Sequence, residues 1–463
     1  MQKCDKKRDS CGQCLRAQIT CPGYHDPKTL VFRDQTETVI QKSRKRGKPS
    51  IPAAITIPVE EQAKHMFISQ YVFGSSPLLD YMPTFYPSGL KDVHLDETIR
   101  AVGLAFFSNE VFSPSVLQTA RKKYGHALLL TNKALQSPQS VTKDTMLLTV
   151  LLLDLFENLV IKDEYSSLEP ETKHIDGAIA LIKLHRKDQF HNAIRLRMFQ
   201  QLSTNFLIRC LQREVEVPSD FISLRTYAAK FVDTNDFKWR FSDLMIRYAR
   251  LRSAIRVGDC SDVQVIQVAM QMDGELLDIC TNMPPESNFS IANVSVPVQS
   301  ANLLWEPVHV YPSHNIRRIW NTIRLARILL NEVIQEYNQR LFGTESSSPD
   351  LNPRIQGHGS LPTLQSLLAD ICASVPQHTE RSMKHLTRTP SSRAGAHTLI
   401  FPLYIAASSP FCPNTMRDWI LGRLRFIGSS LCIPQAIMVK EILEKRKRGN
   451  PWGVAAMLES LSS

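Results

Sequence analysis

Four of the ten cysteines lie within eighteen residues near the start of the chain, from Cys4 to Cys21. Their spacing is Cys4-x6-Cys11-x2-Cys14-x6-Cys21, whereas the other six cysteines are scattered through the rest of the sequence. In the x2 pair, two thiolates on one turn can hold a single ion, and the two x6 arms bring further thiolates to the same centre. The cluster therefore predicts a metal site in the first part of the chain.

The expected redox state of the cysteines favours metal binding over disulfides. Charged residues from Lys3 onward leave no apolar segment for a secretory signal. The longest apolar run, Met146 to Val160, is too short to span a bilayer and contains two acidic residues. We therefore expect a soluble intracellular chain without a membrane partner, in which thiols stay reduced and a dense group of them binds metal.

Zinc is the expected metal, because thiolate-only sites in reducing compartments favour a tetrahedral zinc ion with Zn–S distances of about 2.3 Å. Four basic residues beside the cysteines would offset the charge of several thiolates: Lys6, Lys7, Arg8 and Arg16. Pro22 and Gly23 turn the chain away directly after the last cysteine. His25 could replace a missing thiolate, but a position outside the site is the simpler interpretation.

The positive charge of the chain is concentrated in its first fifty residues. This segment holds twelve Lys and Arg against five Asp and Glu, a net charge of +7 out of +11 for the whole chain. A small basic segment on a nearly neutral body suggests a polyanionic partner, and nucleic acid fits best. A solvated basic tail is the alternative.

The stretch KCDKKRDSCGQCLRAQITCPGY resembles the second part of the fungal binuclear zinc-cluster (Zn2Cys6) DNA-binding domain. That family has the pattern C-x2-C-x6-C, a loop, then C-x2-C followed by a sixth cysteine, and its six cysteines hold two zinc ions. By this resemblance Cys4, Cys11, Cys14 and Cys21 match the third to sixth family cysteines. The resemblance implies a zinc cofactor, these four metal ligands and a partial cluster domain over residues 1–27.

The first two family cysteines, and the basic helix between them that enters the DNA major groove, have no counterpart before Lys3. In the family the first and fourth cysteines bridge the two metals, so Cys11 lacks its bridging partner. Either the start codon is an internal methionine of a longer protein, or the shortened form is genuine. We expect phosphate contacts from the remaining basic residues of the segment: Lys3, Lys6, Lys7 and Arg8.

Residues 28–58 are predicted to form a basic linker. Asp34 to Ser43 has an apolar helical face, but it is too short for a coiled coil. Three prolines then favour an extended chain. A nuclear-localisation or phosphate-contacting patch is expected from the basic side chains here, with a solvated linker as the alternative: Arg44, Lys45, Arg46 and Lys48.

Residues 59–463 are predicted to be all-helical, so the fold class is mainly α. Apolar residues recur at helical spacing in four segments: 119–135, 142–160, 175–188 and 316–342. The second is apolar nearly all round and should be a central buried helix. The strand-like stretch 291–299 is expected to be a loop, and 345–393, rich in Ser, Pro and Gly, a partly flexible excursion.

These segments, with FPLYIAAS and RDWILGRL nearer the C-terminus, resemble the "fungal-specific transcription factor" domain that follows the zinc cluster in many family members. The resemblance implies a regulatory domain with dimerisation, partner or small-effector roles. It implies no catalytic residues.

The sequence indicates no enzyme. It contains none of the dinucleotide-binding, phosphate-binding, zinc-protease or nucleophile-elbow motifs that carry common chemistries. His174 could act as a base, but a surface or capping position is the simpler interpretation. The scattered cysteines lack ligand spacing and are expected to be core thiols: Cys210, Cys260, Cys280, Cys372, Cys412 and Cys432.

The sequence thus predicts a nuclear, zinc-dependent, sequence-specific DNA-binding transcription factor that regulates RNA polymerase II transcription in a fungus. Double-stranded DNA and the transcription machinery are the expected partners, and family members often act as homodimers. The alternative is a truncated regulator that has lost DNA reading and serves as a protein-interaction or ligand-sensing module.

Overall fold

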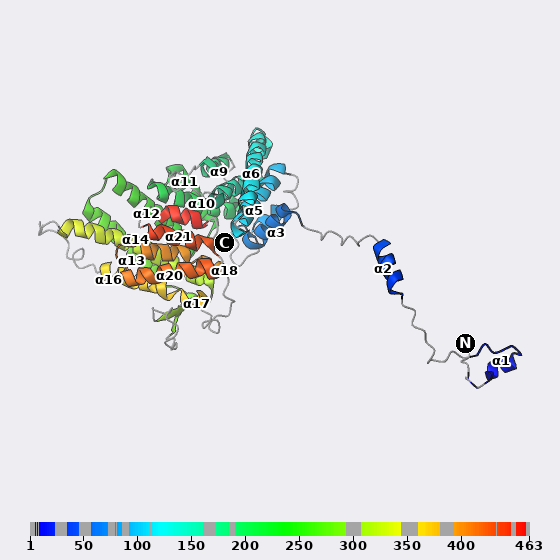
Figure 1. Cartoon of the computed structure of the whole chain (residues 1–463). Coiled ribbons are helices and arrows are strands. Elements are labelled where there is room, and N and C mark those ends of the chain that lie inside the picture. Colours follow the sequence, from blue (N-terminus) through cyan, green and yellow to red (C-terminus); the bar gives the residue numbers. More distant parts are fainter. Residues whose placement is uncertain are drawn as a thin grey trace. The chain divides into compact units, whose positions relative to one another are not determined.

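A computed structural model places most of the chain. It describes residues 5, 7, 9–23, 35–45, 57–72, 79, 81–85, 92–111, 113–160, 173–184, 190–292, 307–343, 360–379, 393–431, 433–445 and 451–459. The chain divides into two compact units, Met1–Ile57 and Pro58–Ser463, and each is described by itself (Figure 1). The described part is mainly α-helical, so the predicted fold class is confirmed. The predicted domain boundaries stay a prediction.

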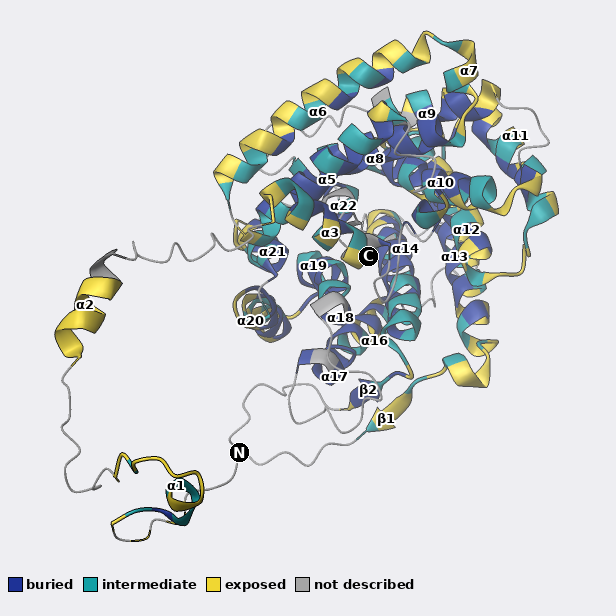
Figure 2. Cartoon of the chain, turned by 90° about the vertical axis from the view of Figure 1, so that its right-hand side faces the viewer, coloured by how far each residue is buried: buried dark blue, intermediate teal, exposed yellow. Residues whose placement is uncertain are grey.

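The N-terminal unit contains two described helices, α1 (Gly12–Arg16) and α2 (Thr36–Lys45). Every side chain described in α2 is exposed, including Val39 and Ile40, which the sequence analysis placed on an apolar face. Figure 2 shows α2 in the colour of exposed residues throughout its described part. Among the described residues of this unit only Cys11 is buried.

The larger unit is a helical body. Its helices are α3 (Val59–Tyr71), α5 (Val93–Val111), α6 (Pro114–Leu135), α7 (Pro138–Val141), α8 (Asp144–Val160), α9 (Lys173–Leu184), α10 (Ala193–Arg213), α11 (Ser219–Ala228), α12 (Phe237–Val257), α13 (Asp262–Thr281), α14 (His314–Gly343), α16 (Ser360–Ala373), α17 (Pro376–Thr379), α18 (Arg393–His397), α19 (Ile400–Ser408), α20 (Asn414–Ser430), α21 (Pro434–Glu444) and α22 (Pro451–Glu459). Short 3-10 turns cover Met82–Phe85, Ala229–Phe231 and Pro285–Ser287.

The described residues of the four segments with helical spacing lie almost entirely in α6, α8, α9 and α14, and residues 185–188 of the third segment lie outside the described part. Helix α8 is the central buried helix that its sequence predicts, and Leu148 and Leu152 are 0% exposed. It packs against α5 and α9, while α6 lies at the periphery with a largely exposed outer face (Figure 2). The burial of most of α8 follows from its nearly continuous apolar surface, which needs neighbours on every side.

The prediction that residues 345–393 form a partly flexible excursion is wrong for part of this range. Residues 360–373 form α16, which packs against α14 and buries Leu364, Leu368 and Ile371 completely. These three side chains are four and three residues apart, so they share one helical face. The sequence analysis missed this helix because its apolar pattern is short and is surrounded by polar residues.

The loop expected over 291–299 is also wrong at its start. Strand β1 (Ser290–Ala292) pairs antiparallel with β2 (Val308–Val310), in the register Ser290 with Val310. Residues 293–299 lie outside the described part. The pairing partner of β1 is distant in sequence, so local alternation alone could not identify the strand.

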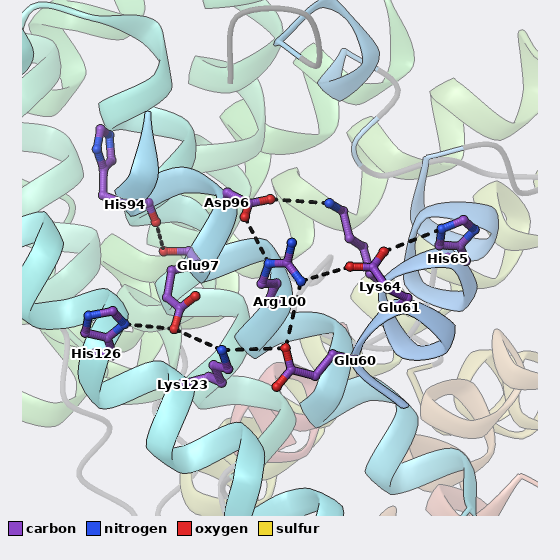
Figure 3. A network of polar contacts seen from close by, with 11 residues as sticks. Glu60, Glu61, Lys64, His65, His94, Asp96, Glu97, Arg100, Lys123 and His126 are labelled. Carbon is purple, nitrogen blue, oxygen red and sulfur yellow. Dashed lines mark hydrogen bonds and ion pairs between the residues drawn. The ribbon is translucent and has the colours of Figure 1, made fainter. Parts of the chain in front are cut away.

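Charged side chains link the first three long helices of the body. Figure 3 shows carboxylates of α3 and α5 alternating with cations of α3, α5 and α6. Arg100 lies 2.9 Å from both Asp96 and Glu61, and Lys123 of α6 lies 3.5 Å from Glu60 and 3.4 Å from Glu97. Gly103 lets α5 approach α3, because a Cβ there would lie 3.2 Å from the carbonyl oxygen of Ala63. Each helix of the described part is too short or too polar to cross a lipid bilayer.

Candidate metal centre

Cys11 begins the only described helix among the first thirty residues. It is the N-cap of α1, and its Sγ accepts a hydrogen bond from the backbone N–H of Cys14 at 3.4 Å. Its carbonyl oxygen accepts from the N–H of Leu15 at 3.1 Å. The tight turn therefore points an N–H group at a sulfur, which stabilises a thiolate and brings both cysteines of the x2 pair to one side.

Three thiols meet at one point. The Sγ atoms of Cys11, Cys14 and Cys21 all lie within 4.8 Å of one another. In a tetrahedral zinc site with Zn–S of about 2.3 Å, neighbouring sulfurs are about 3.8 Å apart. The three sulfurs thus fit three corners of such a site after a small contraction. Among the described residues this is the only group of His, Cys, Asp or Glu side chains with metal-binding proximity.

The backbone around the cluster favours a charged sulfur on Cys21. Hydrogen bonds from the backbone of Cys11 and Gly23 lower the pKa of the Cys21 thiol to about 7. The hydrogen bond with Cys11, with burial and Cys21 as further causes, raises the pKa of Cys14 to about 12. Without a cation the three sulfurs therefore do not all ionise at neutral pH. A divalent metal would supply the positive charge that deprotonates the remaining thiols.

The loop before the helix is held by an acidic side chain. The carboxylate of Asp5 accepts from the backbone N–H of Gly12 at 3.0 and 3.2 Å. A Cβ at Gly12 would lie 2.8 Å from Oδ2 of Asp5, so any other residue here would push this carboxylate from its present position. Asp9 and Gln18 adopt positive φ angles of 73° and 52°, which reverse the chain on each side of the helix. The sequence analysis missed Asp5 and Gly12, since no local pattern pairs residues seven apart in a loop.

The other predicted ligands and contacts are only partly placed. Cys4, the fourth expected metal ligand, lies outside the described residues, as do Lys3, Lys6, Arg8 and His25. Lys7 is exposed. Arg16, expected to offset thiolate charge, donates from Nε to the carbonyl oxygen of Gly12 at 3.0 Å. In the basic patch, the backbones of Arg44 and Lys45 end α2, while Arg46 and Lys48 lie outside the described residues.

The scattered cysteines differ from the cluster. Cys210, Cys372 and Cys412 are buried in the helical body, as predicted for core thiols, and burial raises the pKa of each. Cys260 and Cys280 are half-buried and pack against the core without being enclosed by it. Cys432 lies outside the described residues.

His174 is not the surface or capping residue that the sequence suggested. Its Nε2 lies 3.0 Å from Oε1 of Glu157 and 2.9 Å from the hydroxyl of Tyr124. Tyr124 also donates to Glu157 at 2.6 Å. Packing of α9 against α8 creates this polar cluster, which a single helical segment could not reveal. The hydrogen bond from His174 and that from Tyr124 oppose burial and keep the pKa of Glu157 low.

Comparison with known proteins adds one relative. A protein of Emericella nidulans named "Transcription factor dbaG" is 26% identical to this chain over 141 residues. The match covers 28% of this chain and 31% of the relative, so the chain spans about a third of the relative's length. No family model matches the chain, and no solved structure matches it.

Proposed function

We propose that this chain is a fungal transcription regulator whose N-terminal unit binds one zinc ion. Cys11, Cys14 and Cys21 would supply three thiolates, and Cys4 would supply the fourth. The observation that carries this proposal is the meeting of three sulfurs within 4.8 Å, in a loop whose backbone already stabilises negative charge on sulfur. Zinc would hold the loop together, because the described residues of this unit bury little apolar surface.

Regulation of transcription is supported by two further observations. One is the similarity to a fungal protein that is named a transcription factor. The other is the net charge of +7 on residues 1–50, which suits contact with DNA phosphates. In this proposal the chain acts in the nucleus, contacts double-stranded DNA through Lys3, Lys6, Lys7 and Arg8, and influences RNA polymerase II transcription without any catalytic residue of its own.

A second candidate is a regulator that binds proteins or small ligands without reading DNA sequence. The composition of α1 favours it. This helix has five residues, and its one basic side chain, Arg16, bonds back to Gly12 instead of extending freely. A helix that reads bases in the major groove needs several polar side chains directed outward.

Metal titration of the full-length chain tests the zinc proposal. We expect about one tightly bound zinc, and cobalt substitution should give the absorption bands of a tetrahedral thiolate site. Cys21→Ser should lose most of this binding, while the matched variant Cys260→Ser, at a half-buried thiol of the body, should retain it. Equal zinc binding by wild type and Cys21→Ser would refute the proposal.

Gel-shift titration tests whether the zinc-loaded chain contacts DNA at all. If the first is correct, wild type should bind duplex DNA, and binding should weaken with added salt and with chelation of zinc. Cys21→Ser should bind less tightly than Cys260→Ser. A zinc-loaded chain that does not bind DNA would favour the second candidate.

A further inference from the structure

Arg317 is a buried cation for which the described residues supply no carboxylate counter-charge. It lies in the first turn of α14, and its side chain is 0% exposed. Its Nη2 donates to the carbonyl oxygen of Gly395 and, at 2.8 Å, to Oγ1 of Thr398. Nε and Nη1, which carry the other three N–H bonds of the guanidinium, have no hydrogen-bond partner within the described part of the chain. A cation buried in this way is costly, because few interactions replace its lost water.

Two other arginines on the same helix are neutralised. Nε of Arg324 lies 3.6 Å from a carboxylate oxygen of Asp370. Arg327 makes two hydrogen bonds to the carboxylate of Asp273, at 2.8 and 3.1 Å. Helix α14 thus meets a carboxylate at each of these sites, whereas the structure gives no ion pair to Arg317 among the residues that it describes. Of these three arginines, the one without an ion pair in the described part is the one in the first turn of α14.

The start of α14 is positive in other ways. The helix has 30 residues, so its N-terminal end carries the positive end of a long dipole, yet its first turn holds no acidic residue. His314 lies three residues before Arg317 on the same face, and its Nε2 is buried without a hydrogen-bond partner in the described part. Burial, then the charges of Arg317 and Arg318, lower the pKa of His314. The positive end of the helix dipole, the guanidinium groups of Arg317 and Arg318, and the imidazole of His314 thus all belong to the N-terminal end of α14.

We propose that the first turn of α14 binds the compact anionic group, a carboxylate or a phosphate, of a small ligand. Arg317 supplies the charge through Nε and Nη1, while Gly395 and Thr398 hold Nη2 and so fix the plane of the guanidinium. His314 contributes a further nitrogen to the site. The ligand provides the counter-charge that Asp370 and Asp273 provide farther along the helix. The site belongs to the helical body alone and does not depend on the zinc proposal.

Thermal unfolding of the full-length chain with simple anions tests this site. Inorganic phosphate and malonate serve as probes, each compared with chloride at the same ionic strength. A ligand that binds only the folded state raises Tm, and we expect a rise of at least about 2 °C near saturation with one of the two probes. Arg317→Met should abolish the rise. Arg340→Met, which removes the same charge from an exposed position near the other end of α14, should keep it.

The outcomes are distinct. A response to phosphate alone or to malonate alone identifies the class of anion. No response of wild type, or an equal response of Arg317→Met and Arg340→Met, overturns the proposal. If Arg317→Met does not fold, hydrogen exchange of wild type decides: the probe should protect residues 313–320 and 393–400 relative to chloride, and protection only elsewhere would overturn the site. Zinc chelation should leave the response unchanged, which separates this site from the N-terminal one.

Discussion

The N-terminal unit and the helical body use cysteine in opposite ways. In the N-terminal unit three thiols converge within 4.8 Å, and backbone groups of Cys11 and Gly23 draw negative charge onto Cys21. In the body Cys372 is 0% exposed, and burial raises its pKa well above the ordinary value. The same side chain is therefore a prospective metal ligand in one unit and an apolar filler in the other. Backbone hydrogen bonds to the Cys21 sulfur and burial of the Cys372 sulfur make the difference.

This contrast extends to what stabilises each unit. Leu15 and Ile19, beside the cysteines, are 64% and 61% exposed, so apolar burial contributes little there. The body buries an extensive apolar core that runs through most of its helices. We expect the first unit to depend on a metal and the second to be independent of it.

The largest expected effect is metal removal. A strong zinc chelator should unfold the loop around the three thiols and leave the body intact. All five tryptophans lie beyond residue 200, so their fluorescence reports on the body alone. After chelation we expect rapid tryptic cleavage at Arg16, with unchanged tryptophan emission and helical circular dichroism. A fall in helicity comparable to unfolding of the body would contradict this division.

Truncation of the core should have the next largest effect. Leu148 is 0% exposed in the centre of α8, and Leu148→Ala should destabilise the body by about 2–5 kcal/mol. Leu129→Ala, at a position 70% exposed on α6, should change stability by less than about 0.5 kcal/mol. Urea unfolding followed by tryptophan fluorescence measures both, and zinc content should stay equal. Similar losses in the two variants would be evidence against the packing of α8.

Local sequence patterns predicted the parts of the fold that local physics decides. The periodicity of 119–135 and 142–160 located α6 and α8, because a long helix carries its apolar stripe in its own sequence. The x2 spacing likewise predicted that Cys11 and Cys14 share a turn. Helix α16 was missed because its apolar face is short and lies among polar residues.

Features that depend on distant contacts were not predictable in the same way. Asp5 contacts Gly12 through a loop, and β1 finds its partner beyond an intervening segment. Arg317 donates hydrogen bonds to Gly395 and Thr398, which are far away in sequence. A single sequence contains no local signal for such pairs, so the candidate anion site came from the structure alone.

The pH dependence of the body should come partly from His309. Burial, with the nearby charge of Arg324, lowers the pKa of His309 to about 4, from an ordinary value near 6.5. Well above pH 6.5 the imidazole is neutral in both states. As the pH falls toward 4 the unfolded chain takes up the proton first, so stability falls by up to about 3 kcal/mol.

Urea unfolding at pH 7 and at pH 4.5 measures this effect. His309→Gln keeps a hydrogen-bond acceptor near Arg324 but does not titrate, so its stability should fall less over the same interval. Groups that do not contact His309 are present in both proteins and cancel in the comparison, whereas Asp370, 3.9 Å from Nε2 of His309, is coupled to it. Identical pH profiles would exclude a contribution from His309.

The smallest expected effect comes from substituting one cysteine in each unit, Cys372 in the body and Cys21 in the N-terminal unit. Cys372→Ser places a hydroxyl in an apolar environment and should destabilise the body by about 1–3 kcal/mol, with zinc content unchanged. Cys21→Ser should do the reverse, with zinc lost and the urea midpoint of the body unchanged. Cys372→Ala separates polarity from volume, since it removes the sulfur without adding a polar group. If Cys372→Ser lowered zinc content, or if Cys21→Ser lowered the urea midpoint, the two units would be coupled and thiol chemistry would not divide them.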